Sequence, residues 1–171
     1  SGDPSLYSAV AEQCRRLDAL GIDYEMVPGV PAFAAAAAAL GRELTIPGVA
    51  QTVTLTRVAT LSTAMPDGED LTALAVAGGT LVIHLAAHRI DAVVAELLDA
   101  GRGPGTPAAV VAFASWPRQV VLRGTLADIA ARTHESGVTR TAVIVVGDAL
   151  AAHGFADSYL YSTDRTRGRR H

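Results

Sequence analysis

The chain has 171 residues, half of them apolar, and a formal net charge of −3 at pH 7. This length can bury the core of one domain or of two small ones. The negative charge argues against general nucleic-acid binding. No apolar run approaches the roughly 18 residues of a membrane span, and no basic-then-apolar signal segment is recognisable. We therefore expect no nucleic-acid or membrane partner, and a cytoplasmic location.

Residue usage narrows the chemistry further. All 14 basic residues are arginine, which excludes mechanisms that need a lysine, such as Schiff-base formation. The single Cys14 cannot form an internal disulfide and is expected to act as a small apolar side chain. Only the tail 161–171 is strongly basic, and we expect it to be a solvated end rather than a binding arm.

The first part of the chain predicts one strand between two helices. Apolar residues recur at helical spacing from Leu6 and stop before Gly21. A short apolar run then leads through Pro28-Gly29 into a helix of small residues. The predicted elements are a helix over 6–20, a strand over 24–27 and a helix over 32–40. Because Ser1-Gly2-Asp3-Pro4 has the character of a loop that follows a strand, we expect the natural protein to begin earlier.

The remainder alternates strands and helices after a Pro-Gly linker at 45–48. Two strands are adjacent only at the turn 115–118, which predicts an α/β fold with a mixed sheet. The glycine-rich stretch 101–105 lacks the strand-to-helix context of a dinucleotide site. The predicted strands are 49–58, 80–85, 108–113, 119–123 and 141–146, and the predicted helices are 69–77, 88–98 and 126–133.

Asp3 is the first candidate for a ligand contact, because its carboxylate follows a glycine at a strand end, where open α/β sheets bind ligands. The alternative is that Asp3 or Ser5 caps the helix expected from Leu6. Gly2 and Gly29 would let a ligand approach the main chain closely, or they serve turn geometry alone.

Two further motifs carry open alternatives. His84 and His88 have the spacing of a metal pair on one helix, but His84 falls in a predicted strand and His88 begins a helix. No Cys, Asp or Glu cluster completes a site, so we expect no metal. Trp116, between Ser115 and Pro117, either presents its indole to a flat ligand or covers a strand end as a buried aromatic.

Two motifs, Gly2-Asp3-Pro4 and Val27-Pro28-Gly29, resemble the tetrapyrrole (corrin/porphyrin) methylase family. Further stretches resemble the branch of that family that acts on precorrin-4; they are 38–45, 48–52, 65–71, 114–117, 122–126 and 157–161. The resemblance therefore covers nearly the whole chain.

The resemblance implies two α/β domains with S-adenosyl-L-methionine (SAM) in the cleft between them, usually in a homodimer. We accordingly expect 1–44 to be the remainder of a truncated N-terminal domain with a parallel sheet. A linker at 45–48 would lead to a complete C-terminal domain with a mixed sheet at 49–160, followed by the basic tail at 161–171.

The resemblance also implies an activity, namely SAM-dependent methylation of precorrin-4 or cobalt-precorrin-4 at ring carbon C(11) in cobalamin biosynthesis, with S-adenosylhomocysteine as product. Alternatives are a methylase of this fold acting on another precorrin or porphyrin position, or an inactive SAM-binding or dimerising fragment. No catalytic residue is assigned, because the family's candidate acid and base residues lie on the part expected before Ser1. Carried over by position, the cofactor contacts are Gly2, Asp3, Leu6, Pro31, Ala32, Leu85, Ala114, Thr141 and Ala142.

Overall fold

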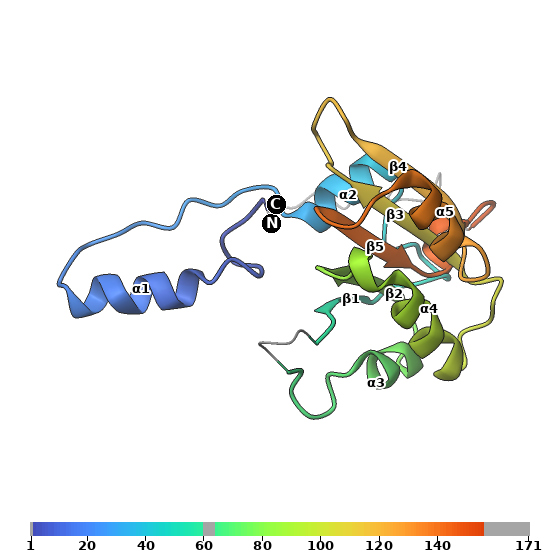
Figure 1. Cartoon of the computed structure of the whole chain (residues 1–171), viewed down its shortest axis with the longest axis horizontal. Coiled ribbons are helices and arrows are strands. Elements are labelled where there is room, and N and C mark those ends of the chain that lie inside the picture. Colours follow the sequence, from blue (N-terminus) through green and yellow to red (C-terminus); the bar gives the residue numbers. More distant parts are fainter. Residues whose placement is uncertain (1, 60–63, 156–171) are drawn as a thin grey trace, which may run out of the picture.

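A five-stranded mixed sheet forms the centre of the molecule, in a computed structural model that describes residues 2–59 and 64–155 (Figure 1). The strand order is β1-β2-β5-β3-β4. β1 and β2 are parallel, whereas the β2–β5, β5–β3 and β3–β4 pairs are antiparallel, which confirms the predicted mixed sheet. The strands are β1 (Val53–Arg57), β2 (Thr80–His84), β3 (Pro107–Ala112), β4 (Val120–Thr125) and β5 (Ala142–Val146).

Helices cover both faces of this sheet. α2 packs on one face, and α3, α4 and α5 pack on the other (Figure 1). Among the described helices, none is long and apolar enough to cross a membrane. The helices are α1 (Val10–Ala19), α2 (Ala32–Leu40), α3 (Leu71–Val76), α4 (Ile90–Asp99) and α5 (Ile129–Ser136), with short 3-10 turns η1 (Ala87–Arg89) and η2 (Asp148–Leu150).

The alternation of side chains along the central strand explains why the sheet is covered on both faces. In β5, Ile144 and Val146 join the core beneath α3, α4 and α5, while Val143 and Val145 join the core beneath α2. Successive residues of a strand point to opposite faces, so a continuous run of β-branched residues fits a strand that is buried on both sides.

The first helix begins later than the sequence predicts. Tyr7 and Ala9 have φ of 51° and 57°, and this left-handed conformation cannot continue into a right-handed helix. The helix therefore starts at Val10, with Ala9 at its N-cap and no side-chain cap. The proposed capping role of Asp3 or Ser5 for a helix beginning at Leu6 is wrong.

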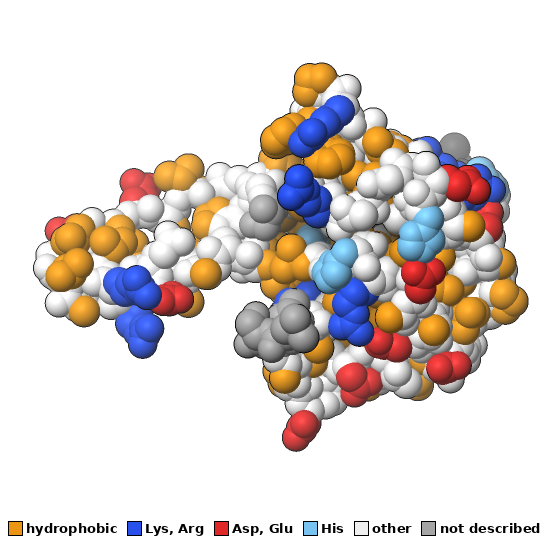
Figure 2. Space-filling view, viewed as in Figure 1, with side chains coloured by type: hydrophobic (Ala, Val, Ile, Leu, Met, Phe, Trp, Pro, Cys, Tyr) orange, Lys and Arg blue, Asp and Glu red, His pale blue; other side chains and the backbone are white. Residues whose placement is uncertain are grey.

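Residues 24–27 form no strand, contrary to the sequence prediction. Their side chains are exposed, and Val27 retains 70% of its accessible surface. A strand needs the backbone groups of a neighbour, and within the described residues no strand lies beside this segment. α1 and the chain that returns from it project from the body (Figure 1), with hydrophobic side chains on their surface (Figure 2).

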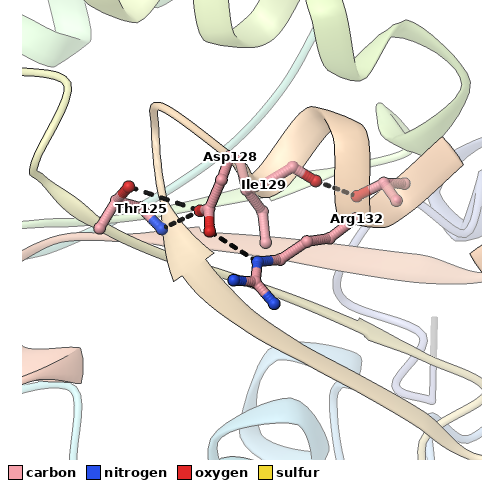
Figure 3. A network of polar contacts seen from close by, with 5 residues as sticks. Thr125, Asp128, Ile129 and Arg132 are labelled. Atoms are coloured by element: carbon pink, nitrogen blue, oxygen red, sulfur yellow. Dashed lines mark hydrogen bonds and ion pairs between the residues drawn. The ribbon is translucent and has the colours of Figure 1, made fainter. Parts of the chain in front are cut away.

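The helix predicted over 126–133 begins at Ile129 because Asp128 organises the turn before it (Figure 3). The Asp128 carboxylate accepts hydrogen bonds from the Thr125 backbone N–H and from the Arg132 Nε, both at 2.7 Å. The Thr125 N–H first, and Arg132 second, hold the pKa of Asp128 below its usual range. The Asp128 carboxylate thus links the last residue of β4 to the first turn of α5.

The predicted division into domains stays a prediction. In the linker at 45–48, Ile46 is buried and forms an isolated bridge with Ala50. α2, which belongs to the predicted first domain, shares a hydrophobic core with the sheet of the second. The motif 157–161 and the basic tail lie outside the described residues.

Candidate functional site

A cleft of about 1070 Å³ opens at the edge of the sheet where β2 and β3 end and β5 begins. These three strand ends meet because β2 and β3 both run antiparallel to β5: His84 pairs with Val143, and Ala112 with Ala142. Open α/β sheets bind ligands outside the carboxyl ends of their strands. A cleft of this volume is slightly larger than the usual range of about 300–1,000 Å³ for small-molecule sites.

Small side chains make the cleft large. Most of the lining alanines belong to α2, whose opposite side packs Ala36 and Leu40 onto the sheet. A helix face of alanine keeps the backbone close to the ligand space without filling it. The nine alanines of the lining are Ala32, Ala34, Ala35, Ala38, Ala39, Ala86, Ala87, Ala114 and Ala142.

Six of the nine residues expected to contact a cofactor line this cleft, and they come from separate parts of the chain. The remaining three, Asp3, Leu6 and Pro31, are close neighbours in sequence of lining residues but do not line the cleft themselves. Ligand contact by any of the nine stays a prediction. The six are Gly2, Ala32, Leu85, Ala114, Thr141 and Ala142.

Asp3 joins the two opening motifs. Its carboxylate accepts hydrogen bonds from the Gly29 backbone N–H at 2.7 Å and from the Ser5 backbone N–H at 2.8 Å, and it also contacts the Ser5 hydroxyl. The Ser5 hydroxyl first, then the Gly29 and Ser5 N–H groups, lower the pKa of Asp3. Asp3 therefore stays ionised at neutral pH and ties the loop at Gly2 to the loop at Gly29.

The two glycines of these motifs are required by backbone contact. A Cβ on Gly29 would lie 2.1 Å from the Gly2 carbonyl oxygen, and a Cβ on Gly2 would lie 2.1 Å from the Val30 carbonyl oxygen. Both separations are far inside van der Waals contact, so only glycine permits this approach. Gly2 also has a left-handed φ of 81°, as the turn-geometry alternative expects, and both glycines let one loop fit against the other.

Left-handed backbone at non-glycine residues is concentrated at the cleft. Among the described residues, six non-glycine residues have positive φ, and all but Ala9 line the cleft. Such conformations cost on the order of 1–3 kcal/mol each and cluster at functional sites. The sequence carried no signal for them, since none is Asn or Asp. The five are Tyr7, Leu85, Phe113, Ser115 and Thr141.

Trp116 stands at the rim of the cleft with 55% of its surface exposed, so the buried-aromatic alternative is wrong. Its ring centroid lies 6.3 Å from that of Phe113. The Arg118 guanidinium lies over both rings, 4.1 Å from the Phe113 centroid and 5.2 Å from that of Trp116. This cation–π arrangement groups the Phe113 and Trp116 rings around the Arg118 guanidinium.

Sequence reasoning did not select His84 as a ligand contact, although it lines the cleft. The side chain is 4% exposed, and its ring centroid lies 5.1 Å from that of Tyr7. Burial lowers the pKa of His84, so the imidazole is neutral at neutral pH. Within 2–59 and 64–155, no group of three or more His, Cys, Asp or Glu side chains could hold a metal ion.

These features define an α/β protein with a large apolar cleft at the edge of a mixed sheet. The sequence pattern of the family described as Tetrapyrrole (Corrin/Porphyrin) Methylases matches residues 1–130. The chain belongs to this family.

Individual relatives agree with that placement. The chain is 76% identical over 165 residues to a precorrin-4 C(11)-methyltransferase from Mycobacterium tuberculosis, covering 96% of this chain and 66% of that protein. It superposes on the X-ray structure of a cobalt precorrin-4 methyltransferase with a TM-score of 0.83 at 40% identity, covering 87% of this chain and 62% of that one.

A third relative was solved with a ligand. It is a uroporphyrin-III C-methyl transferase from Thermus thermophilus complexed with S-adenyl homocysteine, with a TM-score of 0.71 and 26% identity over 88% of this chain and 64% of that one. The chain thus spans about two thirds of the length of the relatives that it matches.

Proposed function

We propose that this chain forms the cofactor cleft of a SAM-dependent C-methyltransferase of corrin biosynthesis that acts on precorrin-4 at ring carbon C(11). The observation that carries the proposal is the convergence of six expected cofactor contacts, from separate segments, on one cleft. The names of the Mycobacterium relative and of the cobalt precorrin-4 structure support the substrate.

The lining fits the chemistry of the cofactor. Alanine walls suit the flat, uncharged adenosine, and the hydroxyls of Ser115 and Thr141 can hydrogen-bond to its polar edges. The rings of Tyr7 and Trp116 suit a positively charged sulfur, because cations are attracted to aromatic faces. When bound, SAM supplies a methyl group carried on that sulfur.

The residues of the chain then act mainly by position. A tetrapyrrole carbon must meet the methyl group in line, and holding two reactants in such geometry supplies much of a rate enhancement. The short side chains of Ala32 and Ala114 leave room for this approach. Asp3 acts indirectly, as a positioning residue. Its hydrogen bond to Gly29 holds together the two loops, one of which places Gly2 at the cleft.

Calorimetric titration with S-adenosylhomocysteine tests the cofactor part of the proposal. Binding with a Kd in the micromolar range or below supports it, and no binding overturns it. A chain of the relatives' full length that carries this sequence is then assayed for methyl transfer to precorrin-4, cobalt-precorrin-4 and other precorrins. Turnover confined to another precorrin favours a methylase of different position, and binding without any turnover favours an inactive SAM-binding unit.

We further propose that the protein is a homodimer in the cytoplasm. Exposed apolar residues on the projecting segment support pairing, among them Leu20 at 72% and Val27 at 70% exposure. Sedimentation equilibrium of the full-length protein tests the dimer: a monomer at micromolar concentration overturns it. Cell fractionation tests the location.

A further inference from the structure

His84 lines the cleft and carries a buried side-chain nitrogen that has no hydrogen-bond partner. It is the last residue of β2, and only 4% of its surface is exposed. Among the described residues, its Nε2 is the only buried side-chain nitrogen or oxygen without a hydrogen-bond partner. Buried polar atoms are otherwise almost always paired, so this one calls for an explanation.

The rest of the lining offers few proton acceptors. No Asp or Glu lines the cleft, and the titratable side chains that do are Tyr7, His84, His88 and Arg140. Tyrosine and arginine hold their protons at neutral pH. Of the two imidazoles, His88 is exposed to solvent, whereas His84 is enclosed.

C-methylation, the function proposed above, creates a demand for such an acceptor. The methyl group arrives as a cation, and the electron pair of the new carbon–carbon bond comes from the tetrapyrrole ring. The C–S electron pair stays on sulfur, which becomes a neutral thioether. The ring then carries one excess positive charge and must release a proton from a ring N–H or C–H, keeping that bond's electron pair.

We propose that the His84 imidazole nitrogen accepts the proton that the tetrapyrrole releases on methylation and is the catalytic base of this cleft. The imidazolium returns the proton to water when the product leaves. The inference rests on the proposed function and assigns the acid–base role that sequence reasoning left open.

The surroundings of His84 keep its imidazole able to accept. Tyr7 covers the ring at 5.1 Å between centroids. On one side β5 presents apolar Val143, and on the other β1 presents Arg57 at the paired position. The pKa of Tyr7 is raised, first by burial, while the Arg57 charge lowers it and the Glu69 charge raises it. Burial lowers the pKa of His84. The free base is therefore present at neutral pH and is lost as the pH falls through this lowered pKa.

The test compares three substitutions in a chain of the relatives' full length. His84→Gln keeps a polar side chain that cannot accept a proton, and we expect it to slow single-turnover methyl transfer about 100-fold, within the range for general bases. His134→Gln is the matched control, since His134 pairs with Asp91 between α5 and α4 and does not line the cleft. It should change the rate less than threefold. His88→Gln tests whether the rate depends on the second histidine that lines the cleft.

Two readouts do not depend on turnover by a variant. The affinity for S-adenosylhomocysteine should change less than threefold in His84→Gln, since the imidazole acts on the tetrapyrrole and not on the cofactor in the proposed step. In the wild-type protein, NMR titration of the His84 imidazole should give a midpoint below 6.5. The single-turnover rate should fall on the acid side with the same midpoint, about tenfold per pH unit below it.

Several results would overturn the inference. They are a rate loss below threefold in His84→Gln, removal of the acid limb by His88→Gln instead, and a tenfold loss of S-adenosylhomocysteine affinity in His84→Gln. Mismatched rate and NMR midpoints would overturn it even where His84→Gln fails to fold. Absence of methyl transfer by the wild-type protein, with S-adenosylhomocysteine bound, contradicts the proposed function itself and is thus distinguishable.

Discussion

The carboxylate of Asp3 accepts a hydrogen bond from the backbone N–H of Gly29 at 2.7 Å, across 26 positions of sequence. This bond connects the two loops that the family motifs identify, and the backbone at Gly2 and Gly29 is in contact beside it. The motifs are therefore one structural unit. Gly2, which lines the cleft, lies directly against the loop at 28–30.

Gly29→Ala tests this unit. The new Cβ would lie 2.1 Å from the Gly2 carbonyl oxygen, so the loops must separate and the Asp3–Gly29 bond must break. We expect S-adenosylhomocysteine affinity to fall at least tenfold in calorimetry. Gly103→Ala is the control, because its Cβ would meet no atom within 4 Å, and it should bind like the wild type. Equal affinity of the two variants would contradict the unit.

The ionisation of Asp3 gives a pH prediction. Its pKa is lowered from the usual 3.8, first by the Ser5 hydroxyl and next by the Gly29 N–H. Because the folded-state pKa is depressed, these bonds contribute in full above the unfolded value and are lost as the pH falls through the folded value. NMR of the side-chain carboxyl carbon should show a midpoint below 3.8. A midpoint at or above 3.8 would mean that the loop contact is absent in solution.

Ala114→Leu separates a cleft position from a core position. The larger side chain should enter the ligand space and weaken S-adenosylhomocysteine at least tenfold, roughly 1.4 kcal/mol, with little change in Tm. Ala109→Leu, at a buried position of β3, should instead cost about 1–3 kcal/mol of stability by overpacking. A large loss of Tm with normal binding in Ala114→Leu would place Ala114 in the core and remove it from the site.

Trp116 is the only tryptophan of the chain and reports on the rim of the cleft. Its indole is 55% exposed, so acrylamide should quench its fluorescence readily in the free protein. Saturation with S-adenosylhomocysteine should change the emission and reduce quenching, with the Kd found by calorimetry. Arg118→Gln removes the guanidinium from both rings and should shift the emission of the free protein. A Trp116 emission spectrum that does not change when the ligand binds would place bound cofactor away from the rim.

Hydrophobic pattern was sufficient to predict most of the sheet. The runs at 80–85 and 141–146 are mostly apolar at both odd and even positions. They form β2 and β5, which are buried on both faces. The alanine run at 32–40 became α2 with the predicted bounds. Local pattern failed where the outcome depends on partners or on backbone strain. Residues 24–27 have strand composition without a neighbouring strand, and Tyr7 and Ala9 adopt conformations that side-chain type does not signal.

Only part of the candidate site could be expected from the sequence. The family resemblance pointed to Gly2, Ala32 and Ala114, and all three line the cleft. The residue types at Leu85 and Thr141 do not signal their left-handed conformation. His84 gained its interest only from its burial and its unpaired Nε2, neither of which a sequence displays.

The place of β5 in the sheet governs when the cleft can exist during synthesis. β5 is last in sequence among the described strands, yet it lies between β2 and β3 and pairs with both. Until residues 142–146 leave the ribosome, the β1–β2 pair and the β3–β4 hairpin have no common neighbour, and each exposes an open strand edge. Such edges are sites of mispairing. A nascent chain arrested before residue 142 should therefore be protease-sensitive and prone to aggregate, and ligand could rescue only chains that extend past β5.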